Sequence, residues 1–406
     1  MKSDIIIIGG GLLGCATAYQ LSKLTDAKIT LIERKDIASQ ATARAACLLT
    51  KSRTKLALMQ MVQETYNAIS ELQQIFNDDL GYSQVGSITA VSSIDSHSAI
   101  EQLCHVASEF GLETQWLESD EVAAKLPWIN ADTITKALYV PTDAYIDSAL
   151  LCNAYANAAK LNGVSIMTRV GVEAILSEAN KITGVILSTG ERIDAPIIIN
   201  ATGSWVNRLM HPKYGALGTT PVRSHFWISE SKPDIFPINQ PFAILPDAKA
   251  FTRPDVGGLI IGIRESKCIS YDSSQWPNDI EDVHFSPDNG WMTLSENAAL
   301  FEKYYTDIRS LGMAHYVAGP SCYTPDSMFL IGAMETTQGL YVAAGCCGGG
   351  VAMSGGIGKL MAEIVLGKEC FVDKNLFNPM RFKNIDPYSE NFRNQCAEAR
   401  SNKKGG

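Results

Sequence analysis

The stretch that decides the fold is Asp4-Ile5-Ile6-Ile7-Ile8-Gly9-Gly10-Gly11-Leu12-Leu13-Gly14, in which four isoleucines run directly into a cluster of glycines. A short, uninterrupted run of β-branched residues is typical of a strand buried on both faces of a parallel sheet. Gly9, Gly11 and Gly14 have the spacing Gly-x-Gly-x-x-Gly. In this pattern the first glycine permits a tight turn, the second lets a pyrophosphate approach the backbone, and the third lets a helix pack closely on the strand. The stretch therefore predicts the start of a dinucleotide-binding βαβ unit.

The residues that follow complete this unit. Residues 12–24 predict a helix whose free N–H groups and positive dipole end point at the pyrophosphate. Residues 28–32 predict the return strand, and Glu33 follows at its carboxyl end. A carboxylate at this position accepts hydrogen bonds from the adenosine ribose and should repel a 2′-phosphate, so NADP is the least expected ligand.

Composition indicates a large globular enzyme with two domains. The chain has 406 residues, of which 46% are apolar and 19% are charged, and this is enough apolar material for a large core. The net charge of −9 disfavours binding to nucleic acid phosphates. No uninterrupted apolar run approaches the roughly 18 residues of a membrane span, so we expect none.

The spacing of cysteine and histidine bears on the redox compartment and on metal binding. The ten cysteines are scattered without a Cys-x-x-Cys pair, and the six histidines have no ligand spacing with them or with one another. Such cysteines are typical of reduced thiols in cytosolic proteins, so we expect a cytoplasmic protein without a metal site.

Further along the chain, periodicity predicts helices and strands in an interleaved order. Helical patterns cover residues 56–76, 96–110 and 148–161, and a last helix ends near residue 366; strand patterns cover residues 86–91, 164–168, 172–176, 182–187, 193–195 and 196–201. From residue 221 to 262, aromatic and polar residues alternate as in an antiparallel sheet with one covered face. We therefore predict an α/β fold in which a Rossmann-like nucleotide-binding domain is interleaved with an antiparallel-sheet substrate domain of α+β character.

We expect the following division of the chain. The nucleotide-binding domain comprises residues 1–80, 142–220 and 325–372, and the substrate domain comprises residues 81–141 and 221–324. Residues 373–406 are polar and weakly patterned, which predicts a loosely held C-terminal tail.

Five segments together resemble a known family. They are Gly9 to Gly14 with Glu33-Arg34, followed by residues 42–48, 201–205, 319–326 and 345–358. In order and spacing they are similar to those of the FAD-dependent amine and amino-acid oxidoreductases of the D-amino-acid oxidase superfamily. Within it, they resemble the branch of the sarcosine and dimethylglycine dehydrogenases and the glycine oxidases. The chain ends where those dehydrogenases continue, so we expect no C-terminal folate-binding domain.

The resemblance implies an FAD cofactor. Residues 42–47 would run beside the flavin ring, where small side chains admit it, and residues 348–350 would lie at its pyrimidine end. From composition alone, an alanine-rich core helix is the alternative for residues 42–47. The implied FAD-binding residues are Gly9, Gly11, Leu12, Leu13, Gly14, Glu33, Arg34, Thr42, Arg44, Ala45, Ala46, Cys47, Leu48, Val172, Ala201, Thr202, Gly203, Trp205, Gly345, Gly348, Gly349, Gly350 and Val351.

Two departures from the family pattern favour noncovalent FAD. The dehydrogenases often carry a histidine at the position of Arg44 that bonds to FAD, and arginine does not form that bond. In the sarcosine oxidases, a cysteine just before a Tyr-Thr pair forms a different covalent bond to FAD. Tyr323 aligns best with that tyrosine if Ser321 takes the place of the cysteine. An offset of one residue would instead put Cys322 there, which keeps a covalent link as the alternative.

Ser321 also changes the expected substrate contacts. Glycine oxidases and D-amino-acid dehydrogenases place an arginine before this segment to bind the substrate carboxylate. In this chain a carboxylate would need another cation, because burying an unpaired anion costs several kcal/mol. Candidates are Arg44, Arg223 and Arg253, and the alternative for each is a structural ion pair or a solvated surface position. His225 and Tyr323 are candidate hydrogen-bonding groups in the pocket, with satisfied core residues as the alternative. No catalytic base is assigned because none is strictly required.

The resemblance implies oxidation of an amine or amino acid. A secondary amine, such as an N-methyl or cyclic amino acid, would lose a hydride to flavin N5 and give an imine that water hydrolyses. Oxygen or an electron-transfer partner would accept the electrons. The alternatives are a D-amino-acid or imino-acid dehydrogenase acting on a primary amine or cyclic substrate, and a noncatalytic flavoprotein-like regulatory subunit.

Overall fold

The computed structural model describes residues 2–210 and 212–403. The helices of this part of the chain are α1 (Leu12–Leu24), α2 (Leu56–Phe76), α3 (His97–Glu109), α4 (Ser119–Lys125), α5 (Ser148–Leu161), α6 (Val206–Met210), α7 (Trp291–Phe301), α8 (Ser354–Val365) and α9 (Glu390–Ser401). The strands are β1 (Ile5–Ile8), β2 (Ile29–Ile32), β3 (Leu48–Leu49), β4 (Ser87–Val91), β5 (Gln115–Leu117), β6 (Lys136–Val140), β7 (Ala144–Tyr145), β8 (Ser165–Met167), β9 (Val172–Glu178), β10 (Lys181–Leu187), β11 (Arg192–Asp194), β12 (Ile197–Asn200), β13 (Thr220–Ser229), β14 (Phe242–Leu245), β15 (Ala250–Asp255), β16 (Gly258–Ile263), β17 (Met313–Tyr323), β18 (Leu330–Ala333) and β19 (Leu340–Ala344).

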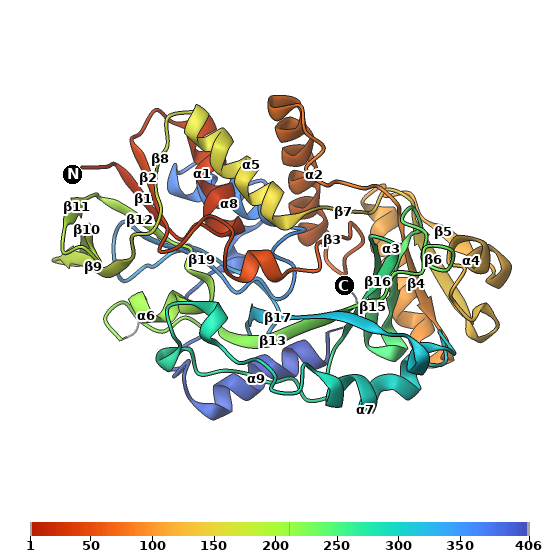
Figure 1. Ribbon diagram of the computed structural model, residues 1–406. Coiled ribbons are helices and arrows are strands. Elements are labelled where there is room, and N and C mark those ends of the chain that lie inside the picture. The colour runs from red at the N-terminus through yellow and green to blue at the C-terminus, as the bar shows by residue number, and fades with distance from the viewer. Residues whose placement is uncertain (1, 211, 404–406) are drawn as a thin grey trace.

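Two large sheets organise the molecule (Figure 1). The first has the order β18-β19-β12-β1-β2-β8 and is parallel except for the pairing of β18 with β19. Its central strand β1 is buried along its whole length, as its isoleucines require. Ile5 and Ile7 face a core shared with α1, α5 and α8, whereas Ile6 and Ile8 face a core shared with the small sheet β11-β10-β9. The predicted Rossmann-like unit is therefore covered on both faces.

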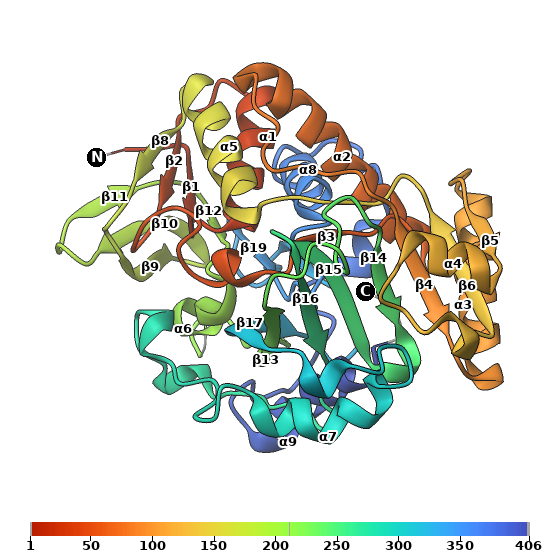
Figure 2. The same ribbon diagram turned by 45° about the vertical axis from the view of Figure 1, so that its right-hand side comes forward.

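The second sheet lies beside the first and is largely antiparallel. Its order is β17-β13-β16-β15-β14-β4-β6-β5, and only the pairing of β14 with β4 is parallel within it. Figure 2 shows α3 and α4 beside its β4-β6-β5 end, with α7 and α9 below the opposite end. The long pair β13 and β17 runs from Thr220 opposite Tyr323 to Ser229 opposite Met313. This pair brings the end of β17 back toward the parallel sheet.

The predicted fold class is confirmed, and the main helices and strands of the parallel sheet lie within a few residues of their predicted bounds. The stretch beside the predicted flavin site is a short 3₁₀ turn, Ala41–Arg44, and the alternative of an alanine-rich core helix was wrong. No residue of that turn is fully buried.

The prediction of a loosely held tail was wrong for the described residues up to 403. α9 packs against β13 and β17 (Figure 1). Its residues Phe392, Cys396 and Arg400 are all buried, and because they are four apart they share one face of the helix. The polar composition of the segment hid this face, since the helix buries few apolar side chains. The last three residues, 404–406, lie outside the described part of the chain.

No helix among the described residues is both long enough and apolar enough to cross a membrane.

Glycines set how closely α1 and α8 approach. A Cβ on Gly358 of α8 would lie 2.5 Å from the carbonyl oxygen of Ala16 in α1. Gly358→Ala should therefore lower the free energy of unfolding by about 1–3 kcal/mol, because backbone has to move apart to admit the methyl group. Denaturant unfolding followed by circular dichroism measures this loss. Gly171→Ala is the matched control, since its Cβ would meet nothing closer than 3.7 Å; equal effects of the two substitutions would contradict the packing argument.

Candidate functional site

A cavity of about 650 Å³ lies at the carboxyl ends of the parallel strands. Its lining includes the glycine loop after β1, Glu33 after β2 and residues 201–205 after β12. It continues past the 3₁₀ turn to the end of β17 and to the loop after β19. One continuous cavity thus joins the predicted dinucleotide site to the antiparallel sheet.

Glu33 is held at one end of the cavity by backbone. Its Oε2 accepts a hydrogen bond from Gly10 N at 2.6 Å, and its Oε1 accepts one from Lys35 N at 2.7 Å. A carboxylate has about four lone-pair sites, so acceptor capacity remains on the oxygens that face the cavity. Nearby, the Arg34 guanidinium lies 4.7 Å from the ring centre of Trp205 and donates to Asn278 Oδ1 at 3.1 Å. This end can hold a ribose between a carboxylate and an arginine.

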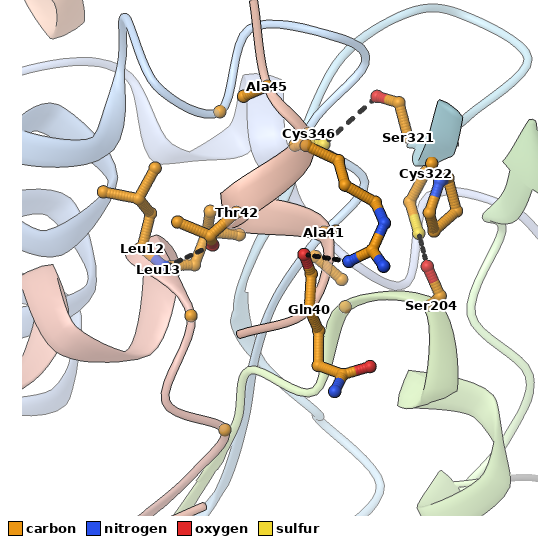
Figure 3. A pocket seen from close by; sticks show the side chains of 18 of the residues that line it. Leu12, Leu13, Gln40, Ala41, Thr42, Ala45, Ser204, Ser321, Cys322 and Cys346 are labelled. Atoms are coloured by element: carbon orange, nitrogen blue, oxygen red, sulfur yellow. Dashed lines mark hydrogen bonds between the residues drawn. The ribbon is translucent and has the colours of Figure 1, made fainter. Parts of the chain in front are cut away.

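The N-terminus of α1 opens into the cavity without a capping side chain on Gly11. Leu12 N donates to Thr42 Oγ1 at 3.3 Å (Figure 3). A Cβ on Gly11 would also meet Thr42 Oγ1 at 3.3 Å, which is a tight contact. The bare glycine and the helix dipole together suit an anionic group such as a pyrophosphate.

The 3₁₀ turn forms the middle of the cavity wall. Ser148 Oγ donates to Thr42 O at 2.7 Å, which ties the turn to the start of α5. Arg44 donates from Nη1 to Gln40 O at 3.3 Å (Figure 3), and its side chain packs over β17, where a Cβ on Gly319 would lie 2.9 Å from Arg44 Cδ. Its ion pair with Glu281, at 4.0 Å, is long and Glu281 is mostly exposed, so this pair contributes little.

The far end of the cavity is built from β17 and the loop after β19. Gly348 N donates to Ser321 Oγ at 3.0 Å, and Ser321 Oγ lies 3.4 Å from Cys346 Sγ (Figure 3). Cys322 Sγ lies 3.4 Å from Ser204 Oγ. Burial raises the pKa of the Cys322 thiol, so it stays protonated at neutral pH.

Nearly all the predicted FAD-binding residues line this one cavity. The exceptions are Gly14 and Gly349. Gly14 lies under the loop, where a Cβ would be 1.9 Å from Gly9 O, so its role is the packing of α1 on the strand. Gly349 instead faces a neighbouring second cavity.

The candidate substrate residues divide into two groups. Arg44 and Tyr323 line the cavity, whereas Arg223, His225 and Arg253 do not. Arg223 donates from Nε to Glu265 Oε1 at 2.8 Å, and both side chains are more than 90% buried, so this arginine is already compensated. Arg253 pairs with Asp255 at 3.3 Å.

His225 is a neutral core residue. Its Nδ1 lies 3.0 Å from Tyr316 Oη and its Nε2 lies 3.4 Å from Glu265 Oε1. Burial lowers the pKa of His225 to about 4, outweighing the opposite effect of Glu265. The contact with Glu265 is therefore not an ion pair at neutral pH.

Five cations in the cavity wall were missed by the sequence analysis. They are Arg53, Arg208, Arg264, Arg400 and Lys403. Arg53 follows β3, Arg208 lies in α6 and Arg264 follows β16, where no motif marks them, and the other two come from the segment predicted to be loose. The four-residue spacing of Phe392, Cys396 and Arg400 is the one signal that could have revealed the helix face.

Comparison with known proteins gives the class of protein. The model of the family described as FAD dependent oxidoreductase matches residues 4–364. The chain belongs to this family. It is similar to the mitochondrial pyruvate dehydrogenase phosphatase regulatory subunit of Mus musculus, with 27% identity over 366 residues, which are 89% of this chain and 41% of that protein. It is also similar to the mitochondrial sarcosine dehydrogenase of Homo sapiens, with 24% identity over 90% of this chain and 40% of that protein.

The chain thus spans about 40% of the length of these two relatives. Among solved structures, the crystal structure of L-proline dehydrogenase from P. horikoshii superposes with a TM-score of 0.82 and 24% identity, covering 94% of this chain and 98% of that chain. The expected relation to sarcosine and dimethylglycine dehydrogenases and to glycine oxidases is confirmed.

The residues present fit FAD. The loops that approach the cofactor expose bare backbone, and a Cβ on Gly9 would already lie 2.5 Å from Ala201 O. An uncapped helix N-terminus, a carboxylate after β2 and a wall of small side chains follow one another along the cavity. Groups of three or more potential metal ligands do not occur among the described residues.

The buried His225 should make stability depend on pH. Its pKa is about 4 in the folded chain and about 6.5 when unfolded, so between these values only the unfolded chain binds the proton. Stability should fall as pH drops from 6.5 to 4, by up to about 3 kcal/mol from this group. Urea unfolding of wild type and His225→Gln at several pH values measures the difference. Parallel pH profiles of the two proteins would show that His225 titrates normally.

Proposed function

We propose that this chain oxidises a secondary amine, such as an N-methyl or cyclic amino acid, with bound FAD. The observation that carries the proposal is the single cavity that joins the glycine loop of β1 to β17 and the antiparallel sheet. A dinucleotide at one end would then present its reactive ring to a pocket at the other end. The predicted FAD-binding residues, and the division into two interleaved domains, form part of this proposal.

The side chains at the far end suit an amine substrate. FAD, when bound, supplies the chemistry, because it accepts a hydride from the carbon next to the nitrogen. Phe226 and Phe251 line the cavity from the antiparallel sheet and exclude water. The cations of the wall, Arg264 and Lys403 among them, disfavour a second positive charge and so favour the neutral amine that oxidation requires. Water then hydrolyses the imine product.

A noncatalytic regulatory role is the second candidate. The similarity to the phosphatase regulatory subunit favours it, because that protein is named for regulation and not for oxidation. In that case the chain would bind FAD in the same cavity without turning over an amine. Oxidation of a primary amine or a D-amino acid is the remaining alternative.

Anaerobic reduction of the bound flavin tests the enzyme proposal. Purified holoprotein mixed with N-methyl amino acids or proline analogues should lose its yellow absorbance, and D-amino acids and polyamines serve as comparison substrates. Fastest bleaching by a secondary amine is the expected result. Fastest bleaching by a primary D-amino acid would replace the secondary-amine proposal with its alternative.

A yellow protein that dithionite reduces but no amine bleaches would favour the regulatory role. Gly11→Val is a matched control for cofactor loading, since its side chain would crowd Thr42 Oγ1 where the pyrophosphate is proposed to bind. This variant should be purified with little FAD.

We also propose that FAD is bound noncovalently. Supporting this, the side chain that accepts a hydrogen bond from Gly348 in the loop after β19 is Ser321, which has no thiol, and the raised pKa of Cys322 disfavours its nucleophilic thiolate. Acid precipitation should leave a colourless pellet and release all the FAD into the supernatant. A yellow pellet from wild type that becomes colourless in Cys322→Ser would instead establish a link through that cysteine.

A further inference from the structure

The C-terminal end of α9 reaches the same cavity. Arg400, in its last turn, is only 5% exposed, and its Nη1 donates to Tyr323 Oη at 3.3 Å. Lys403, just beyond the helix, donates from Nζ to the carbonyl oxygen of Cys347 at 3.1 Å. Both side chains line the cavity. A segment outside the five family motifs therefore supplies two cations to the site.

These two cations have only neutral hydrogen-bond partners in the described part of the chain. Neither forms an ion pair there, and the buried Nε of Arg400 has no acceptor. The acidic residues that line the cavity, Glu33, Asp36 and Glu173, belong to the segments around the nucleotide end. Glu265 acts on Arg400 electrostatically but is bonded directly to Arg223. Arg400 is buried and Lys403 is partly buried, and holding two cations there with so little compensation is costly unless an anion joins them.

Lys403 lies beside Gly348, in the loop proposed to face the flavin, and Arg400 reaches the same place through its hydrogen bond to Tyr323. A Cβ on this glycine would lie 2.7 Å from Tyr323 Oη and 3.3 Å from Lys403 Nζ. The N–H of Gly348 donates to Ser321 Oγ. By the resemblance, Ser321 stands where glycine oxidases carry a substrate-binding arginine. Lys403 and Ser321 both lie next to Gly348, so a cation from the C-terminal segment lies close to the place of the missing arginine.

We propose that Arg400 and Lys403 bind the carboxylate of the substrate, so that α9 is part of the active site. This rests on the proposed function, which it deepens by assigning the residues that bind the carboxylate of an amino-acid substrate. Arginine offers a planar pair of donors and lysine a point charge, and together they can bind both carboxylate oxygens.

The electrostatics of the wall support this assignment. Burial lowers the pKa of Lys403 to about 7, and Arg53, Arg264 and Arg400 act in the same direction, whereas Cys347 acts in the opposite direction. A bound carboxylate would favour the protonated ammonium and offset this cost. The site is thus better suited to an amine that carries a carboxylate than to an amine without one.

Binding of carboxylate probes to the oxidised holoprotein tests the proposal without turnover. Benzoate, succinate and acetate are titrated while the visible absorbance of FAD is followed, with benzamide, succinamide and acetamide as uncharged counterparts. At least one carboxylate should perturb the spectrum, and its amide should bind at least about tenfold more weakly. Lys403→Met should weaken the carboxylate by about tenfold or more, whereas Lys403→Arg should retain most of the binding.

Matched variants separate this role from a structural one. Arg393→Gln removes a charge from the same helix at a residue outside both cavities and should bind like wild type. Arg400→Gln should weaken binding as Lys403→Met does; if it fails to fold, Lys403→Met decides alone. The proposal is overturned if no carboxylate binds, if acids and amides bind equally, or if Lys403→Met binds like Arg393→Gln.

These outcomes are distinct from those of the flavin reduction experiment. If carboxylate binding depends on Lys403 but no amine reduces the flavin, the carboxylate subsite is kept and the proposal of amine oxidation is rejected. If an amine reduces the flavin but Lys403→Met does not change carboxylate binding, the enzyme proposal is kept and the carboxylate subsite is rejected.

Discussion

The close contact between the glycine loop and its neighbours is the constraint on which the rest of the structure depends. Gly14 allows α1 to lie against Gly9 O, and Gly9 allows the loop to lie against Ala201 O. Any side chain at either glycine would push α1 away from the ends of β1 and β12. Because the cavity opens at those strand ends, this spacing sets the room between the parallel sheet and the 3₁₀ turn.

The second sheet contributes by reaching back to this point. The pairing of β13 with β17 runs without a shift from Thr220 to Ile228, which is long enough to bring Ser321 and Tyr323 to the loop after β19. The two sheets would otherwise be neighbours without a shared site. The strands of the two sheets alternate along the chain, and both sheets contribute residues to the wall of one cavity.

The parallel sheet and the glycine loop were predictable from the sequence because residues close together in the chain determine them. The isoleucine run, the glycine spacing and Glu33 are local signals, and they led to the correct strands, helices and sheet. The wall near the antiparallel sheet was harder to predict, because its residues come together only through tertiary packing. Arg223 and His225 stand in a strand of the right sheet, yet their side chains are buried around Glu265 and not in the cavity. Arg400 and Lys403 were missed because α9 is polar overall and buries few apolar residues, so its composition hid the face that packs on the sheet.

The charges of the wall link substrate binding to the chemistry. Cations near the reacting centre raise the cost of an ammonium ion and lower the cost of a carboxylate. An amino acid in its zwitterionic form would be poorly matched to such a site, whereas the same molecule with a neutral nitrogen would be well matched. Lys403, whose pKa is about 7, is the group most able to adjust, since it can gain a proton as the carboxylate arrives. In the proposed subsite, the proton that Lys403 gains would be the one that the substrate ammonium releases, so the net charge of the cavity stays the same and the substrate is left with the neutral nitrogen that hydride loss requires.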